Sequence, residues 1–298
     1  MENTKLNILP VPTFGSLGVN FVRRDIEEYE TNNKLLDIDN NTLIREDITG
    51  SSDYKINVKN NADAIVVQYV KVDGKALVDT QIKAEAGTRL KLVQIFDGSV
   101  QTVSRLNATL EDNASLELVL LVLGGNDTVC ETVAALDGRC SSFKADIGYT
   151  LGSGDNLDIN LIADHNGRKT DSQILVNGVL DGNASKTFKG TIDFKNGSAG
   201  SKGAEQENVL VLDEKAVNKT VPVILCAEED VEGSHGATIG RIDDKQAFYM
   251  RSRGFDEQKL YELLARARLK QVIGAIGERQ TESRIYKALD WGDYDEQE

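Results

Sequence analysis

One histidine near the C-terminal end, His235, is the residue best suited by type to bind a metal ion or to transfer a proton near neutral pH. It lies between small residues in the run Ser234-His-Gly-Ala237, so neighbouring side chains do not crowd its ring. Cys226 lies nine residues earlier and could supply a thiolate, which is a soft metal ligand. This spacing predicts facing positions for the two side chains on adjacent strands or turns.

An acidic cluster separates this cysteine from the histidine, and it includes Glu228 and Glu232. Their carboxylates could hold iron as hard oxygen ligands, or orient the ring of His235. The pattern also fits a small buried thiol, a hydrogen-bonded histidine and an acidic turn in water, because zinc and iron ligand sets usually show tighter Cys/His pairing. The residues alone favour this structural interpretation.

The rest of the chain offers little for catalysis. It has two histidines, His165 and His235, and no Gly-x-Ser-x-Gly nucleophile elbow. The stretch Gly124-Gly-Asn-Asp127 is rich in glycine but lacks the Lys-Ser/Thr of a phosphate-binding loop. We therefore predict no catalytic residues and no bound nucleotide. Cys130 and Cys140 are interpreted as core or surface residues.

The composition limits the class of protein. The 298 residues carry 34 Lys and Arg against 48 Asp and Glu, a net charge of −14, which argues against binding to nucleic acid. Three cysteines without zinc-type spacing fit a reducing compartment. The chain shows no secretion signal and no apolar run of membrane-spanning length. These features predict a cytoplasmic protein that does not bind a membrane.

A regular β pattern begins near residue 53 and continues for almost two hundred residues. Asx-Gly pairs that favour tight turns separate short β-prone runs. The predicted strands are Tyr54–Val58, Ala64–Val70, Arg89–Phe96, Val100–Leu110, Leu116–Leu123, Thr128–Leu136, Leu157–Ala163, Gln173–Val176, Thr187–Phe194, Val209–Leu212, Val221–Ala227 and Ser234–Ile242. The pattern is compatible with a sandwich, a barrel or a solenoid, and its uninterrupted length favours a solenoid over a single sandwich without deciding among the three.

The two ends of the chain differ from this middle part. Leu6–Phe14 contains two prolines and reads as an extended lead-in, and Val22–Tyr29 reads as a short helix. Beyond Gly254 the pattern becomes helical, with Asp256 as N-cap and an apolar face that includes Leu260 and Leu264. A second short helix carries Ile285, Tyr286 and Leu289. Residues 251–287 hold nine basic and five acidic side chains, a local balance of +4.

Two segments carry a resemblance to a known family. The run Glu228-Glu-Asp-Val-Glu-Gly-Ser-His-Gly-Ala-Thr-Ile-Gly240 and the run Ala247-Phe-Tyr-Met-Arg-Ser-Arg-Gly254 resemble the C-terminal signature of the SufB/SufD proteins, scaffold components of iron–sulfur cluster assembly. The similarity continues upstream through Gly178–Phe194 and Lys202–Leu212, and it is specific over about residues 165–290.

The resemblance implies an all-β fold, a right-handed parallel β-helix with a small C-terminal helical segment. We accordingly divide the chain into a lead-in (1–52), a β-helix core (53–248) and a helical, ATPase-docking segment with an acidic tail (249–298). The resemblance also implies a non-enzymatic scaffold subunit that works with a SufC-type ABC ATPase and pairs with itself or with a SufB-like paralogue. The expected cargo is a transient iron–sulfur cluster.

The resemblance implies roles for particular residues. The motif histidine, His235, is expected to bind the nascent cluster, with Cys226 and Glu232 as further candidates. SufD-like relatives often place a cysteine two residues before the motif histidine, where this chain has Gly233. The helical segment is expected to bind the ATPase through Arg251, Arg253, Leu260, Leu264, Arg266 and Arg268.

Two other functions remain open from the sequence. A carbohydrate-active β-helix enzyme, a lyase or a glycosidase, would need a groove with paired carboxylates or a basic catalytic residue. A structural interaction module would need no metal at all. The sequence does not decide between SufB-like and SufD-like roles, between homodimer and heterodimer, or between cluster types and ligand sets, and it assigns no role to the first 50 residues.

Overall fold

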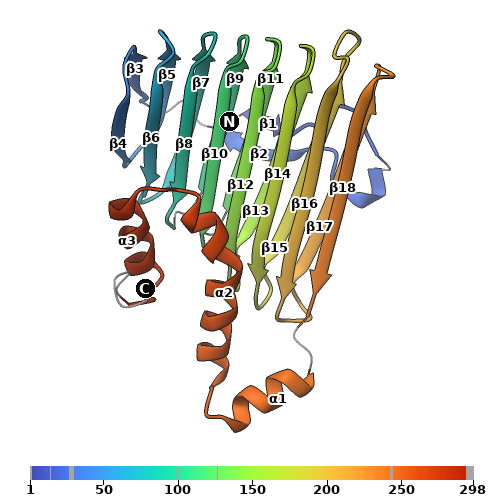
Figure 1. The fold of residues 1–298 in the computed structure, drawn as a ribbon. Coiled ribbons are helices and arrows are strands. Elements are labelled where there is room, and N and C mark those ends of the chain that lie inside the picture. The colour runs from blue at the N-terminus through green and yellow to red at the C-terminus, as the bar shows by residue number, and fades with distance from the viewer. Residues whose placement is uncertain are drawn as a thin grey trace.

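Parallel strands that alternate between two facing sheets form most of the molecule (Figure 1). The computed structural model describes residues 2–13, 15–26, 30–98, 101–125, 127–241 and 244–292. The odd-strand sheet contains β3 (Asn32–Ile38), β5 (Ser52–Val58), β7 (Lys75–Ala84), β9 (Gln101–Leu110), β11 (Asp127–Leu136), β13 (Asn156–His165), β15 (Ser185–Phe194) and β17 (Val217–Cys226). The even-strand sheet contains β4 (Thr42–Ile48), β6 (Asp63–Val70), β8 (Arg89–Phe96), β10 (Ser115–Leu123), β12 (Ser142–Leu151), β14 (Asp171–Leu180), β16 (Ser201–Val211) and β18 (Val231–Gly240).

Each sheet pairs its strands in sequence order and in parallel, so the chain winds through about seven turns of a β-solenoid. The predicted solenoid with a C-terminal helical segment is confirmed. Burial alternates along most strands, as it does in Tyr54, Ile56 and Val58 of β5, because every second side chain points between the sheets. This interior holds the main hydrophobic core.

The N-terminal part of the chain differs from the sequence interpretation. The strands β3 and β4 lie inside the expected lead-in and pair with β5 and β6, so the solenoid begins near residue 32. The predicted helix over Val22–Tyr29 is wrong, since Val22–Ile26 form the strand β2, while residues 27–29 lie outside the described residues. The last strand ends at Gly240, and helix α1 (Asp244–Ser252) begins before the expected limit at 248.

Most of the predicted strands are confirmed within a few residues, although β7 and β12 were not predicted, and Val100 and Ile242 lie outside the described residues. The pair Asn177-Gly178 is not a turn, since both residues belong to β14. A Cβ atom on Gly178 would lie 1.9 Å from the Tyr149 ring, so glycine is required there to admit that ring. The turn glycines Gly74 and Gly182 do have positive φ, as expected.

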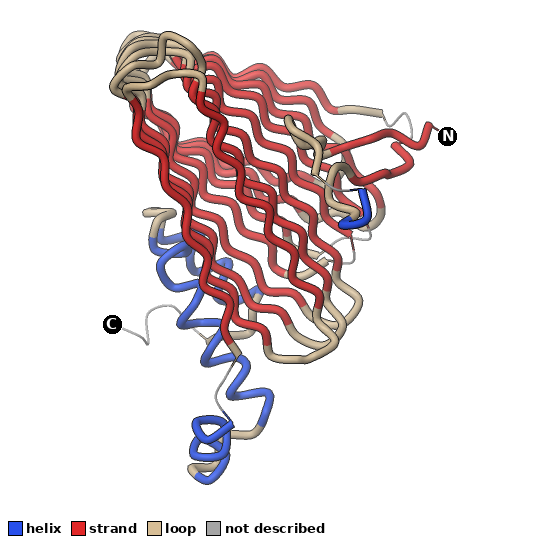
Figure 2. Tube along the Cα trace, turned by 90° about the vertical axis from the view of Figure 1, so that its right-hand side faces the viewer, coloured by secondary structure: helices blue, strands red, loops and turns tan. Residues whose placement is uncertain are grey.

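A short antiparallel hairpin, β1 (Glu2–Leu6) and β2, covers part of the outer face of the odd-strand sheet (Figure 2). The side chain of Leu6 packs with Val103 and Val129 in a small separate core. A 3₁₀ turn, η1 (Gly15–Leu17), lies between the two strands of the hairpin. The first residues of the chain, expected only as an extended lead-in, therefore pack against the solenoid.

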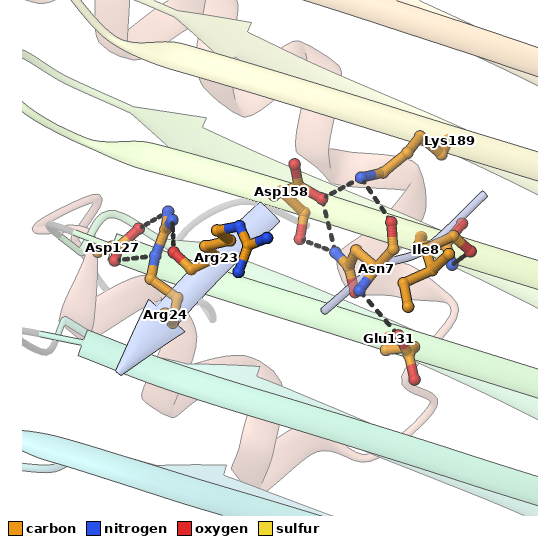
Figure 3. A network of polar contacts seen from close by, with 9 residues as sticks. Asn7, Ile8, Arg23, Arg24, Asp127, Glu131, Asp158 and Lys189 are labelled. Atoms are coloured by element: carbon orange, nitrogen blue, oxygen red, sulfur yellow. Dashed lines mark hydrogen bonds and ion pairs between the residues drawn. The ribbon is translucent and has the colours of Figure 1, made fainter. Parts of the chain in front are cut away.

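Polar contacts anchor this hairpin next to Asn7 (Figure 3). The Asn7 side-chain amide donates to Oδ1 of Asp158 at 2.6 Å, and its backbone N–H donates to Oε2 of Glu131 at 2.9 Å. Lys189 donates to the backbone oxygen of Asn7 at 3.0 Å and pairs with Asp158 at 2.7 Å. Arg24 also pairs with Asp127 at 2.5 Å. The hairpin thus covers a buried lysine on the outer face of the sheet.

Three helices follow β18, and Figure 2 shows them on the opposite face from the hairpin. Helix α2 (Glu257–Gly274) begins at the N-cap Asp256, whose side chain accepts from the Lys259 N–H at 2.8 Å, as predicted. Leu269 and Val272 of α2 are fully buried in a second core against the even-strand sheet. Helix α3 (Arg279–Ala288) packs in the same core, whereas α1 extends away from the solenoid (Figure 1). Among the described residues, no helix combines the length and apolar character needed to cross a membrane.

Candidate functional site at the open end of the solenoid

The strand β18 is the last member of the even-strand sheet and pairs with β16 alone among the described strands. Its outer edge therefore presents unpaired backbone groups. Strand β17 occupies the same position in the other sheet. The predicted strands at Val221–Ala227 and Ser234–Ile242 are confirmed as the end of the solenoid, apart from residue 242. This open end is where another chain could continue the sheets.

His235 belongs to a column of inward-facing side chains that runs along the solenoid axis. Strand register aligns Leu118, Ala145, Ile174, Glu205 and His235 in that order on β10 through β18. The first four are at most 4% exposed, and His235 is exposed because no further strand of the described chain covers it. The column therefore changes from apolar to acidic and ends on the histidine at the open end.

Glu205 lies directly below His235 in this column and is 4% exposed. Its carboxylate occupies the space beside Gly190, since a Cβ atom on Gly190 would lie 1.9 Å from Oε2 of Glu205. Burial raises the pKa of Glu205 to about 7, the negative charge of Glu207 acts in the same direction, and Lys186 opposes both. The negative charge of Glu205 is therefore less stable than that of an exposed carboxylate.

A buried ion pair neighbours this carboxylate inside the solenoid. Lys186 and Glu207 are both fully buried and pair with each other, and Thr220 donates to the second oxygen of Glu207 at 2.6 Å. Burial lowers the pKa of Lys186, and the charge of Glu207 opposes that shift. The hydroxyl of Tyr149, which is also fully buried, has no hydrogen-bond partner among the described atoms. The apolar core thus becomes polar over its last turns.

Cys226 also occupies an inward position, but it lies at the end of β17 and not on β18. It ends β17, aligns with Phe194, and its thiol donates to the Glu228 backbone oxygen at 3.0 Å. His235 lies on the opposite sheet, four residues beyond the start of β18, which is about 13 Å of strand. No group of three or more potential metal ligands occurs among the described residues. The described chain therefore does not unite the cysteine and the histidine in one ligand cluster.

Glu232 lies on the other side of β18 from His235. Its position in the strand alternates with the inward residues, its side chain is 74% exposed, and it pairs with Lys202 at 2.9 Å. This places Glu232 on the outer face of the sheet, so it does not share a site with His235 in the same chain. Glu228 is used locally, because its carboxylate accepts the backbone N–H groups of Gly197 and Glu229, both at 3.0 Å.

An open groove of about 950 Å³ lies beside helix α2 at this end of the molecule. Gln271 of α2 lines it together with residues of β12, β14, β16 and β18, among them Lys144, Asp171, Lys202 and Glu232. The groove combines charges of both signs. A protein segment could therefore be held there by polar contacts.

Some of the predicted docking residues in the C-terminal segment are buried in the molecule, and others are exposed on its surface. Leu260 is 6% exposed and Leu264 is partly buried, and both pack in the core between the helices and the sheet. Leu260 is therefore an internal contact, because the apolar face that the sequence showed is used by the chain itself. Arg266 pairs with Glu262 at 3.2 Å and Arg268 is half-buried. Arg251 and Arg253 are exposed next to Phe248 and Tyr249, which are 74% and 55% exposed.

Sequence reasoning missed Glu205, Glu207 and Lys186 as parts of this end of the molecule. The signal was present, because Glu205 and Glu207 alternate in step with Val209 and Val211 and therefore share their inward face. A period of two that continues from charged into apolar residues indicates that the charged residues are buried.

The fold defines a class of protein, a parallel β-solenoid whose last turns are polar inside and whose last strands are not covered by a further described strand. Comparisons with known proteins show the family of the chain. The family model described as "SUF system FeS cluster assembly, SufBD core domain" matches residues 44–268. The chain belongs to the SufBD family.

Curated relatives carry the same family name. The chain is 28% identical over 184 residues to the iron-sulfur cluster assembly protein SufD of Bacillus subtilis, covering 61% of this chain and 42% of that protein. It is 26% identical over 246 residues to an iron-sulfur cluster assembly SufBD family protein of Mycobacterium leprae, covering 79% of this chain and 63% of that protein. The matches thus span about half of the length of these relatives.

Proposed function

We propose that this chain is a non-enzymatic scaffold subunit that supports assembly of iron–sulfur clusters at the open end of its solenoid. The observation that carries the proposal is the position of His235, an inward-facing and exposed imidazole on the last strand. Imidazole is a ligand for iron, and a histidine at an open sheet edge can be covered by a second chain. Membership of a cluster-assembly family supports the same function.

The site is shared between two chains in this proposal. One chain brings His235, and the partner adds its own cysteine or carboxylate when the two edges meet. The partner is a second copy or a SufB-like paralogue, and the cluster is cargo that is built there and passed on. The separation of Cys226 from His235 supports a shared site, because one chain alone supplies few ligands at this place. Since iron–sulfur clusters are labile in water, we expect pairing to bury the site.

The proposed energy source is a SufC-type ABC ATPase bound at the C-terminal segment. The exposed side chains of Phe248, Tyr249, Arg251 and Arg253 supply an apolar and basic surface on and beside α1. Closure of two ATPase subunits would shift the paired scaffold chains and expose the interface between them to iron and sulfide. Such coupling needs two states whose balance the nucleotide changes. We expect this complex to work in the cytoplasm.

Carbohydrate cleavage is the alternative enzyme function, and the interior carboxylates do not favour it. Glycosidases use two carboxyl groups that flank a substrate bond in an accessible cleft. Glu207 is fully buried in an ion pair with Lys186, and Glu205 is buried beside Gly190. A polysaccharide chain would not reach them.

Complementation tests the proposed function. The variant His235→Ala should retain its circular dichroism and its oligomeric state but fail to restore cluster assembly in cells that lack the wild-type chain. The matched control is Glu232→Ala on the outer face of the same strand, which should restore assembly fully. Normal complementation by His235→Ala would contradict the proposal, and it would support the metal-free interaction module instead.

A further inference from the structure

Glu205 is a buried carboxylate for which the described protein supplies no partner. No hydrogen bond or ion pair joins its side chain to the described residues, so Lys186 acts on it through charge alone, and the residue is only 4% exposed. Glu207 in the same strand shows the usual solution, since its two oxygens pair with Lys186 and Thr220. A buried carboxylate that lacks such contacts is costly to fold around unless it is protonated or binds a cation.

The surroundings leave space for this carboxylate at one defined place. Gly190 faces it from β15, and the missing Cβ atom leaves room for Oε2 of Glu205. The hydroxyl of Tyr149 and the amide group of Asn218 are further interior polar groups without partners among the described atoms. The last turns of the solenoid therefore contain several polar groups without a hydrogen-bond partner in the described part of the chain.

The column arrangement places Glu205 and His235 one strand spacing apart, about 4.8 Å between backbones, with both side chains on the inward face. A carboxylate oxygen and an imidazole nitrogen on neighbouring positions of one face suit a first-row divalent ion such as ferrous iron. Lys186 forms its ion pair with Glu207 and acts on Glu205 through charge alone, so the Glu205 carboxylate stays available to a cation.

We propose that Glu205 is a second metal ligand from this chain and holds a ferrous ion together with His235 at the open end. This inference rests on the proposed function, because it adds an oxygen ligand to the site that His235 defines. The pair would retain iron in a single chain before a partner completes the site. A SufD-like chain with Gly233 in place of a cysteine would in this way still contribute two ligands.

Cobalt(II), a spectroscopic substitute for ferrous iron, tests this pair in the purified full chain under anaerobic conditions. Titration of the wild-type chain should give visible absorption bands from the bound ion. Glu205→Gln preserves the shape of the side chain and should weaken binding by at least about tenfold. His235→Ala should weaken it similarly, and the outer-face control Glu232→Gln should bind as the wild type does.

A stability measurement separates a ligand from a structural residue. If Glu205 serves the metal, Glu205→Gln should raise the urea midpoint of the metal-free chain at pH 8, because it removes a buried unpaired charge. A lower midpoint would show a structural role and overturn the inference. The variant Gly190→Ala adds an independent test, since it moves the carboxylate without changing any ligand, and it should also weaken cobalt binding.

The outcomes distinguish this inference from the proposed function. Wild-type affinity in Glu205→Gln combined with loss in His235→Ala would overturn the role of Glu205 and leave the histidine site intact. Absence of cobalt binding by the wild-type chain would also overturn the inference, while complementation would still test the shared site. Wild-type affinity in both variants would place the bound cobalt elsewhere on the chain and overturn the inference, while complementation would still test the shared site.

Discussion

Lys186 on β15 and Glu207 on β16 form an ion pair inside the solenoid, and both side chains are fully buried. The pair lies in the last covered turn, where the interior changes from aliphatic to polar. Because the pair is shielded from water, each charge is stabilised mainly by the other. This relationship predicts an asymmetric response to mutation.

Replacing one partner of the ion pair should destabilise the protein much more than replacing both. Lys186→Met leaves an uncompensated charge on Glu207 and should lower the free energy of unfolding by about 3 to 5 kcal/mol. The double variant Lys186→Met/Glu207→Leu should recover most of that loss. Urea unfolding followed by circular dichroism measures both values. Equal loss in the single and the double variant would contradict this prediction.

The hairpin anchor gives a second prediction. Asn7 is fully buried, has a φ of 51°, and its side chain donates to Asp158. Asn7→Ala removes these hydrogen bonds and places alanine in a left-handed conformation, so it should destabilise the chain by about 2 to 4 kcal/mol. Asn7→Gly removes the same bonds without the backbone strain and should be the milder change. Urea unfolding that ranks glycine as the worse substitution would contradict this account.

The buried histidine His165 predicts a pH dependence of stability. Its ring nitrogens contact Thr170 and Ser172 at 2.6 and 2.8 Å, and burial lowers its pKa from 6.5 to about 4. The unfolded chain therefore binds more protons between these values. As the pH falls from about 6.5 to 4, this residue should remove about 3 kcal/mol of stability.

The comparison variant His165→Gln isolates this contribution, because glutamine retains hydrogen bonding but does not titrate. The free energies of unfolding of both proteins should be measured in urea at pH 7.5 and pH 4.5. The wild type should lose more stability than the variant over this interval. Equal losses would indicate that carboxylates, rather than His165, set the acid sensitivity.

The docking surface gives a fourth prediction. Phe248 is 74% exposed on α1, far from the solenoid core, so Phe248→Asp should leave the fold unchanged. It should weaken binding of a SufC-type ATPase by about thirtyfold if this side chain is a central contact. Isothermal calorimetry measures the change, with Arg89→Ala on β8, in the N-terminal half of the solenoid, as control. Unchanged affinity would exclude α1 as the docking surface.

The fold could be predicted from strand periodicity and turn residues over most of its length. The solenoid itself required the family resemblance, because alternation alone is common to sandwiches, barrels and solenoids. The strands β3 and β4 were missed because polar residues dominate both, and only Leu36, Ile38, Ile44 and Ile48 face the core. Val22–Ile26 were read as helical because charged residues dominate a strand that packs through only one face.

The site was less accessible to sequence reasoning. His235 could be found from its neighbours and motif, but its link with Glu205 depends on strand register across thirty residues. The expected link with Cys226 and Glu232 rested on closeness in sequence, and the solenoid separates them by sheet and by face. Leu260 belonged to an apolar face that had two possible uses, and the chain uses it to attach α2 to the even-strand sheet.

Anaerobic reconstitution tests the central claim most directly. The full chain, with its partner scaffold chain and ATPase, is incubated with ferrous iron and sulfide, and cluster absorption is recorded for the wild type, His235→Ala and Glu232→Ala. The account predicts a cluster band in the wild type and in Glu232→Ala, and its loss in His235→Ala while the complex stays assembled. A band of wild-type intensity in His235→Ala would contradict the claim that clusters form at the open end of this solenoid.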